Sequence, residues 1–280
     1  MTFKQAIKLF LLTSLCGILW SSMVFAQQEH LSVQAERDKR PAKSYLPLNI
    51  NEHTISLYGK KVILNPSGFP EQLQTYFNSE MNGLSTDPKN ILAESIHFHL
   101  INSATHKDIK MANEGITFTE KKTGKIKWSA VNSSDLLNMQ INGSLEYDGF
   151  LSYTVKLTAL KDTKLDNIKF HIPLTKEASK YLTGLGYKEG LRADTVKWKW
   201  DSASKTLAGA WMGDLNTGLR YSLFPASAWD NNRKGGIWIA EKGRSILSEN
   251  FTGEVEMKKG EVCYYNFTLL ITPFHLVTDQ

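Results

Sequence analysis

Cysteine is scarce in this 280-residue sequence, which contains only Cys16 and Cys263. Cys16 lies in an N-terminal leader that we expect to be removed, so the mature chain would keep one cysteine and could form no internal disulfide. Its stability must then come from an ordinary hydrophobic core, and a chain of this length can bury one. An exported protein without disulfides suits a bacterial periplasm or cell surface better than an animal secretory route.

Long hydrophobic runs are also scarce, since only residues 9–25 form one, shortly after Lys4 and Lys8. This order, with Ala26 at its end, is typical of a secretory signal peptide, so we expect residues 1–26 to be cleaved. Polar residues interrupt the run, which disfavours a transmembrane anchor. We therefore expect an exported protein, periplasmic, extracellular or at the cell surface, with no membrane span after cleavage.

Neither sign of charge dominates the expected mature chain. Removal of residues 1–26 takes away two lysines and no acidic residue, which lowers the formal net charge from +5 to +3. Basic and acidic residues are interleaved throughout, without the basic stripe that nucleic-acid binding requires. We expect no nucleic-acid partner.

Familiar catalytic and cofactor motifs are missing. The sequence has no G-x-S-x-G elbow, no phosphate-binding loop, no H-E-x-x-H pair and no dinucleotide fingerprint. It also lacks amphipathic stretches of helical length between strand-like runs, which disfavours βα units and a parallel sheet. We expect no cofactor and no parallel α/β architecture.

Short runs rich in β-branched and aromatic residues are present instead, separated by Gly, Asn, Asp and Pro. This texture predicts an all-β fold, a large antiparallel β-sandwich with little helix. We assign residues 54–280 to the sandwich and residues 27–53 to a linker or lead-in strand. The one short helix expected is Thr175–Leu182. The expected strands are 54–58, 61–64, 72–77, 95–101, 116–119, 125–131, 136–145, 151–160, 168–173, 195–200, 207–212, 218–223, 236–241, 252–257 and 262–271.

Three of the seven tryptophans lie within residues 196–219. Trp198 and Trp200 alternate with charged residues, so both indoles should project from one face of a strand. The simplest interpretation is a hairpin that pairs this strand with Leu207–Met212. Buried packing is the commoner role for such rings, while an exposed platform for a sugar is the functional alternative. The candidate carbohydrate-binding residues are Trp198, Trp200, Asp201, Trp211, Asp214 and Asn216.

Two histidines, His97 and His99, fall on the same face of an expected strand, a geometry that metal sites use. A third ligand is needed, and His106 and His171 are the available candidates. Nothing in the spacing brings either of them near. We therefore expect a solvated strand face and no metal ion.

Paired carboxylates, which glycoside hydrolysis usually requires, are not evident. Most of the candidate aspartates stand beside Gly, Asn or a turn, where Asp serves by bonding its own backbone. The candidates are Asp148, Asp194, Asp201, Asp214 and Asp230. We expect Asp148-Gly149 to form a tight turn between two long strands, and we assign no catalytic residue.

An ordered series of short motifs carries a family resemblance. The motifs are Tyr147-Asp148-Gly149, Ile172-Pro173-Leu174, Lys180-Tyr181, Gly184-Leu185-Gly186, Trp198-Lys199-Trp200-Asp201, Trp211-Met212-Gly213-Asp214-Leu215-Asn216, Gly218-Leu219, Gly235-Gly236-Ile237 and Thr272-Pro273-Phe274. In this order they resemble the N-terminal domain of glycoside hydrolase family 123 and related large exported proteins of Bacteroidetes. The resemblance covers roughly Thr54 to Phe274.

The resemblance implies a β-sandwich that precedes a (β/α)₈ barrel in a secreted enzyme. In that family the enzyme removes N-acetylgalactosamine from glycoconjugates with an adjacent Asp and Glu in the barrel. The present sequence has no Asp-Glu dipeptide and stops at Gln280, where the barrel would begin. No catalytic residue can be carried over.

The first hypothesis is therefore a non-catalytic accessory domain, a truncated or split piece that works with a downstream or separate (β/α)₈ catalytic domain on a carbohydrate or glycoconjugate. The alternatives are a free-standing carbohydrate-binding module and a glycosidase with an unrecognised site among Asp201, Asp214 and Asp230.

Overall fold

The computed structural model describes residues 47–200, 208–224 and 227–274. Strands dominate these residues, and helix is limited to two single 3₁₀ turns, η2 (Glu177–Ser179) and η3 (Asn231–Arg233). All strand pairs are antiparallel, so the expected all-β sandwich with little helix is confirmed. In these ranges no helix is long and apolar enough to cross a membrane.

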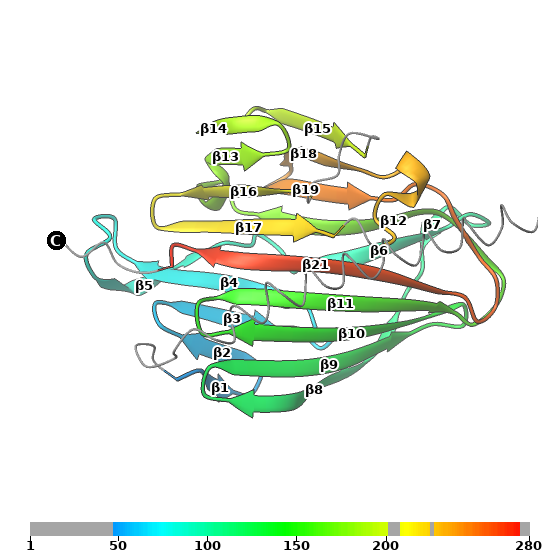
Figure 1. The fold of residues 1–280 in the computed structure, drawn as a ribbon, viewed down its shortest axis with the longest axis horizontal. Helices are drawn as coiled ribbons and strands as arrows, with labels where there is room; N and C mark the ends of the chain where they lie inside the picture. The colour runs from blue at the N-terminus through cyan, green and yellow to red at the C-terminus, as the bar shows by residue number, and fades with distance from the viewer. Residues whose placement is uncertain (1–46, 201–207, 225–226, 275–280) are drawn as a thin grey trace, which may run out of the picture. The chain divides into compact units, whose positions relative to one another are not determined.

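The strands form three sheets (Figure 1). The five-stranded sheet contains, in spatial order, β1 (Asn49–Asn51), β2 (Thr54–Leu57), β3 (Lys60–Leu64), β4 (Pro70–Phe77) and β5 (Leu84–Asn90). The nine-stranded sheet contains β14 (Tyr187–Leu191), β13 (Tyr181–Gly184), β16 (Ala208–Asp214), β17 (Thr217–Leu223), β21 (Val262–Thr272), β11 (Phe150–Ala159), β10 (Leu137–Glu146), β9 (Lys125–Ser133) and β8 (Ala112–Lys122). The seven-stranded sheet contains β15 (Thr195–Lys199), β18 (Gly236–Lys242), β19 (Ser245–Phe251), β12 (Thr163–Leu174), β6 (His97–Asn102) and β7 (Lys107–Asp108), with β20 (Val255–Met257) paired to β12.

Alternating burial along the strands positions the core. In β9 every second residue from Ile126 onward is buried, and the residues between them are partly exposed. This period of two puts one face of each strand on the core and the other toward solvent. The β10–β11 hairpin turns at Asp148-Gly149 as predicted, with Gly149 at φ +91° and the Asp148 carboxylate accepting the Phe150 N–H.

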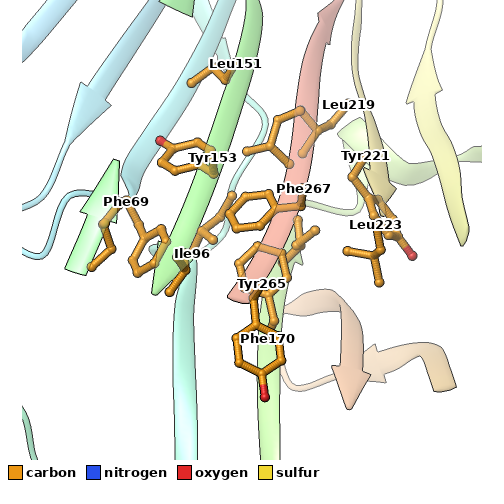
Figure 2. Packing of buried hydrophobic residues seen from close by; sticks show 14 of the residues in the cluster. Phe69, Ile96, Leu151, Tyr153, Phe170, Leu219, Tyr221, Leu223, Tyr265 and Phe267 are labelled. Carbon is orange, nitrogen blue, oxygen red and sulfur yellow. The ribbon is translucent and has the colours of Figure 1, made fainter. Parts of the chain in front are cut away.

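Aromatic side chains join the three sheets at the centre of the core. Tyr153 on β11 and Phe267 on β21 stack with ring centroids 4.8 Å apart, and Phe170 on β12 lies 4.4 Å from Phe267. Phe69, just before β4, contacts Tyr153, Phe170 and Phe267 (Figure 2). Offset and edge-on rings of this kind contribute about 0.5–1.5 kcal/mol per pair beyond their area burial. Residues from all three sheets therefore share one hydrophobic core.

Two local predictions are wrong. The predicted hairpin between Thr195–Trp200 and Leu207–Met212 does not form, because β15 pairs with β18 while β16 pairs with β13 and β17 in another sheet. The expected helix Thr175–Leu182 shrinks to η2, and the chain from Tyr181 onward pairs as β13. In both places long-range pairing overrides the local pattern.

Several strands were not predicted. They are β5, β7, β13, β14 and β19. The polar sequence of β5, which includes Pro88, gives no strand signal, yet β5 pairs at the edge of its sheet where proline is tolerated. β1 lies in the stretch 27–53 expected to be a linker or lead-in strand, and residues 27–46 lie outside the described ranges, as does the expected signal peptide.

A glycine-floored groove as candidate functional site

A groove of about 500 Å³ lies on β13, β16, β17 and β21. These four strands are neighbours in the nine-stranded sheet (Figure 1). Its volume is in the range of small-ligand pockets. The lining residues are Thr183, Gly184, Gly209, Ala210, Trp211, Arg220, Ser222, Leu270, Thr272 and Phe274. We refer to this set as the Trp211 groove.

Glycines alternate with larger residues along the strands that floor the Trp211 groove. On β16 the core side is taken by Ala208, Ala210 and Met212, so Gly209 and Gly213 fall on the groove side with Trp211 between them. A Cβ atom at Gly209 would lie 2.1 Å from the Tyr221 carbonyl oxygen, which no real side chain could accept. The glycines therefore allow neighbouring backbones to approach closely, and they leave space above the sheet that side chains would otherwise fill.

The Trp211 indole lies across the sheet above Gly213. A Cβ atom at Gly213 would lie only 2.5 Å from Trp211 Cζ2, and the indole Nε1–H donates a 2.9 Å hydrogen bond to Thr272 Oγ1 on β21. Gly213 pairs with Gly218, and Gly218 pairs with Thr272, so the ring spans β17 to reach its acceptor. This flat, partly exposed ring, fixed at its polar end, is a geometry suited to stacking on a planar or sugar-like ligand.

Arg220 stands beside the ring, because Trp211 and Arg220 are paired across β16 and β17. Its side chain is exposed, and among the described residues no ion pair or hydrogen bond engages its guanidinium. A free guanidinium next to an aromatic ring can donate several hydrogen bonds in one plane. Hydroxyls of Thr183, Ser222 and Thr272 complete the polar lining.

A second cation, the buried Lys60, lies near the ring of Phe274, which lines the Trp211 groove. Lys60 Nζ lies 6.0 Å from the centroid of the Phe274 ring and donates to the Asp148 carbonyl oxygen at 2.9 Å. Burial lowers the pKa of Lys60 to about 8, although the nearby Asp148 charge opposes this. The groove lining contains no aspartate or glutamate, so it can bind hydroxyls or anionic groups but offers no acid–base pair.

The three predicted tryptophans are separated. Trp211 belongs to the groove, whereas Trp198 and Trp200 belong to β15 and the residue after it, by the seven-stranded sheet. Both indoles share one face as expected, at 4.8 Å between ring centroids in an edge-on arrangement. Trp200 is 5% exposed, so its ring is core packing.

The predicted polar partners do not join Trp211 either. Asn216 is buried, donates to the Phe77 carbonyl oxygen and accepts from Lys89 Nζ, so its amide ties the β16–β17 turn to the five-stranded sheet. The carboxylate of Asp214 lies 3.6 Å from Lys180 Nζ. Asp201 lies outside the described residues.

Asp214 lines a second, more open cleft of about 740 Å³. Four cationic residues share this lining, namely Lys89, Lys176, Lys180 and Arg192. Most of these cations already bind within the fold, since Lys89 donates to Asn216 and Lys176 pairs with Glu241. The cleft therefore has fewer free groups for a ligand than the Trp211 groove.

The structure brings a third histidine to His97 and His99, which the sequence spacing did not indicate. The sequence spacing brings no third histidine near His97 and His99, but the structure places His171 directly across from His97 on the paired strands β6 and β12. The three side chains form a group with ligand-type nitrogens within 4.8 Å of one another. His106 lies elsewhere and pairs with Asp166.

Sequence reasoning missed Arg220, Thr272 and Phe274 as groove residues. A usable signal was present in the order Gly209-x-Trp211-x-Gly213 followed by Gly218-x-Arg220. In a strand, glycines two residues either side of a tryptophan leave room for the ring to lie flat on the sheet. The glycine spacing therefore indicates that the Trp211 ring lies on the outer face of the sheet. The alternation of apolar and polar residues alone does not tell the outer face from the core face.

One comparison with known proteins shows the family, and solved structures show only a distant likeness. The model of the glycoside hydrolase 123 third domain matches residues 48–227 and 221–273. Among curated proteins no sequence matches the chain. The galactose mutarotase related enzyme from Lactobacillus acidophilus is 8% identical over 81% of this chain and 99% of its own, with a TM-score of 0.44.

Two lyase structures show a likeness of the same order. The heparinase III gene product is 9% identical, with 90% of this chain and 40% of that chain covered and a TM-score of 0.45. The heparan sulfate lyase from Pedobacter heparinus is 9% identical, with 81% of this chain and 34% of that chain covered and a TM-score of 0.38. The chain thus spans less than half the length of these two lyases.

The family match extends over nearly all of the described residues and confirms the resemblance inferred from the ordered motifs. The matching model is that of a third domain, whereas the sequence motifs were likened to an N-terminal one. This chain belongs to the glycoside hydrolase 123 family through its third domain.

Proposed function

We propose that the chain is a non-catalytic accessory domain of a glycoside hydrolase 123 protein and that it binds a carbohydrate in the Trp211 groove. The observation that carries the proposal is the Trp211 ring, held flat over Gly213 by the bond to Thr272 and flanked by the free guanidinium of Arg220. A sugar ring presents an apolar face and a rim of hydroxyls. A partly exposed indole with donors beside it complements both.

The proposed ligand is an N-acetylhexosamine-containing glycoconjugate. The family match supports a carbohydrate-related role, and the N-acetylgalactosamine activity implied by the sequence resemblance indicates the first sugar to test. The lining supports a preference for neutral or acidic sugars over basic ones, because its only charged side chain is Arg220. Affinity should be weak, since the groove is open and presents one main stacking ring.

A catalytic role is disfavoured by the chemistry of the lining. Glycoside hydrolysis usually needs two carboxyl groups held about 5–10 Å apart across the scissile bond. The Trp211 groove has none, and Asp214 in the neighbouring cleft is paired with Lys180. We propose that catalysis belongs to a (β/α)₈ domain, downstream or on a separate chain, and that this domain assists it.

Titration with N-acetylgalactosamine and its oligomers, followed by tryptophan fluorescence and calorimetry, tests carbohydrate binding. We expect saturable binding that is lost in Trp211→Ala and weakened in Arg220→Met. Trp238→Ala is the matched control, because Trp238 is 46% exposed on β18 of the other sheet. Binding that survives Trp211→Ala, or disappears equally in Trp238→Ala, would exclude the groove as the site.

A panel of aryl glycosides, including the N-acetylgalactosaminide, tests the absence of catalysis. We expect no release of chromophore from the isolated chain. Turnover that disappears in Asp201→Ala or Asp214→Ala would replace the accessory-domain proposal with that of a glycosidase.

We further propose that the protein is exported and that its mature form begins at Gln27. The support is the order of basic, apolar and small residues within 1–26. Intact-mass measurement of the exported protein should give the mass of residues 27–280. A mass that retains residues 1–26 would contradict this.

A further inference from the structure

Three histidine rings meet on the outer face of the seven-stranded sheet, away from the Trp211 groove. His97 and His99 lie on β6, and His171 lies on β12 directly opposite His97. The ring centroids are 4.7 Å apart for His97–His99, 5.1 Å for His97–His171 and 4.6 Å for His99–His171. All three rings are mutually edge-on, with one nitrogen of each within 4.8 Å of the others.

Each ring is held from behind by a hydrogen-bond acceptor. His97 Nδ1 lies 2.7 Å from the Ser95 carbonyl oxygen, and His99 Nδ1 lies 3.0 Å from Asp108 Oδ2. His171 Nε2 lies 3.0 Å from Glu249 Oε2. In protein metal centres, ligating histidines almost always donate their second ring N–H to a carboxylate or carbonyl in this way.

The acceptors determine which nitrogens carry protons. The Asp108 carboxylate also accepts the Leu100 N–H, and the Glu249 carboxylate also accepts a 3.0 Å bond from Lys169 Nζ. Each acceptor therefore needs a proton from its histidine, which leaves a lone pair on the opposite nitrogen of a neutral ring. For His97 and His99 these nitrogens are both Nε2, and for His171 the nitrogen is Nδ1.

The facing Nε2 atoms of His97 and His99 lie only 3.0 Å apart. Three short contacts run in a row: from the Ser95 carbonyl oxygen to His97 Nδ1, from His97 Nε2 to His99 Nε2, and from His99 Nδ1 to Asp108 Oδ2. Each of these contacts needs one hydrogen atom to be a hydrogen bond. Two neutral imidazoles supply only two. A cation between the two nitrogens, either a third proton or a metal ion, would satisfy the third contact.

The environment favours the metal cation over the proton. A proton would serve only the contact between His97 and His99, whereas His171 brings a third ring nitrogen within 4.8 Å of these two. A tetrahedral ion with metal–nitrogen bonds of about 2.0–2.1 Å separates its nitrogen ligands by roughly 3.3 Å. The Nε2 atoms of His97 and His99 lie close to this spacing, at 3.0 Å, and the three ligand nitrogens lie within 4.8 Å of one another. Asp108 and Glu249 supply two negative charges behind the rings against one positive charge from Lys169.

We propose that His97, His99 and His171 form a three-histidine centre for a divalent transition-metal ion of the zinc type. Three imidazole ligands suit Zn²⁺, Cu²⁺, Ni²⁺ and Co²⁺ rather than Mg²⁺ or Ca²⁺, which take oxygen ligands. The His99 side chain is 33% exposed, so the fourth ligand is water or a solvent-borne group. Binding ties β6 to β12, and it does not depend on carbohydrate binding in the groove.

The test uses the full chain without a polyhistidine tag, stripped with a chelator and titrated with Co²⁺ and then Zn²⁺. We expect one equivalent of Co²⁺ to produce visible absorption bands of low-coordinate cobalt, which one equivalent of Zn²⁺ abolishes. Zn²⁺ should also raise the Tm, because it binds the folded state. Asp108→Asn keeps the shape of the backing group and should weaken binding about 10- to 100-fold.

His99→Ala should weaken binding more than Asp108→Asn does, because it removes a ligand. His106→Ala is the matched control, an exposed histidine paired with Asp166 outside the cluster, and it should bind like the wild type. His99 is partly exposed, so its variant should keep the native circular dichroism spectrum. Binding with no saturation at one equivalent, or equal binding in His99→Ala and His106→Ala, would overturn the proposal.

Discussion

The Trp211 groove and the histidine cluster are opposite solutions to placing polar groups on the outer face of a sheet. In the groove, glycines remove side chains so that one ring can lie flat, and Arg220 is left without a partner among the described residues. In the cluster every imidazole has an acceptor behind it, and two of those acceptors are carboxylates. The open groove with the guanidinium of Arg220 suits a flat or anionic ligand. The imidazole nitrogens of the cluster, whose opposite nitrogens face hydrogen-bond acceptors, suit a cation.

Both regions rest on the same aromatic core, and removal of one central ring should disturb them together. Phe267 is fully buried and contacts rings from β11 and β12. We expect Phe267→Ala to lower the free energy of unfolding by about 3–5 kcal/mol, measured by denaturant titration. Tyr264→Ala, on the same strand but 47% exposed, should cost far less. Equal losses would mean that the core does not support the two regions jointly.

A second change separates the regions. Gly213→Ala places a methyl group 2.5 Å from Trp211 Cζ2 and 2.9 Å from the Thr217 carbonyl oxygen. We expect a loss of about 1–3 kcal/mol in stability and loss of carbohydrate binding, with metal binding unchanged. Gly190→Ala, whose added Cβ meets nothing within 4 Å, is the control. Unchanged carbohydrate binding in Gly213→Ala would show that the flat ring is not needed.

Acid should weaken the contribution that Glu249, beside His171, makes to the stability of the fold. The pKa of Glu249 is about 2 in the folded protein against an ordinary value of 4.5. A depressed carboxyl pKa stabilises the fold above pH 4.5, and this contribution fades as the pH falls toward 2. The contribution is on the order of 1–2 kcal/mol after screening by solvent. The difference in unfolding free energy between wild type and Glu249→Gln should shrink over this window, and a constant difference would contradict the assignment.

The smallest effect expected is at the acceptor of the Trp211 indole. Thr272→Val removes the oxygen that accepts the Nε1–H while it keeps the side-chain shape. We expect a loss of about 0.5–1.5 kcal/mol in stability and weaker carbohydrate binding from a less fixed ring. Acrylamide quenching of tryptophan fluorescence and sugar titration would measure both. A variant that binds sugar like the wild type would restrict the role of Thr272 to stability.

Sequence periodicity predicted the fold class well, and it predicted the candidate site only in part. Most strand positions follow from local alternation, and the β10–β11 turn follows from Asp148-Gly149. Trp211 was singled out as a candidate and lines the groove, but it was grouped with Trp198 and Trp200, which lie by another sheet. Neighbours in sequence were assumed to be neighbours in space, and this assumption fails when consecutive strands join different sheets.

The sequence by itself determined the antiparallel all-β architecture, because a period of two and turn residues act over a few positions and need no distant partner. Only the tertiary structure decided that Arg220 flanks Trp211 and that His171 faces His97. Residues 97 and 171 meet through the register of β6 against β12. Register depends on which faces the whole core buries, and a shift of one residue would turn His171 to the opposite face of the sheet.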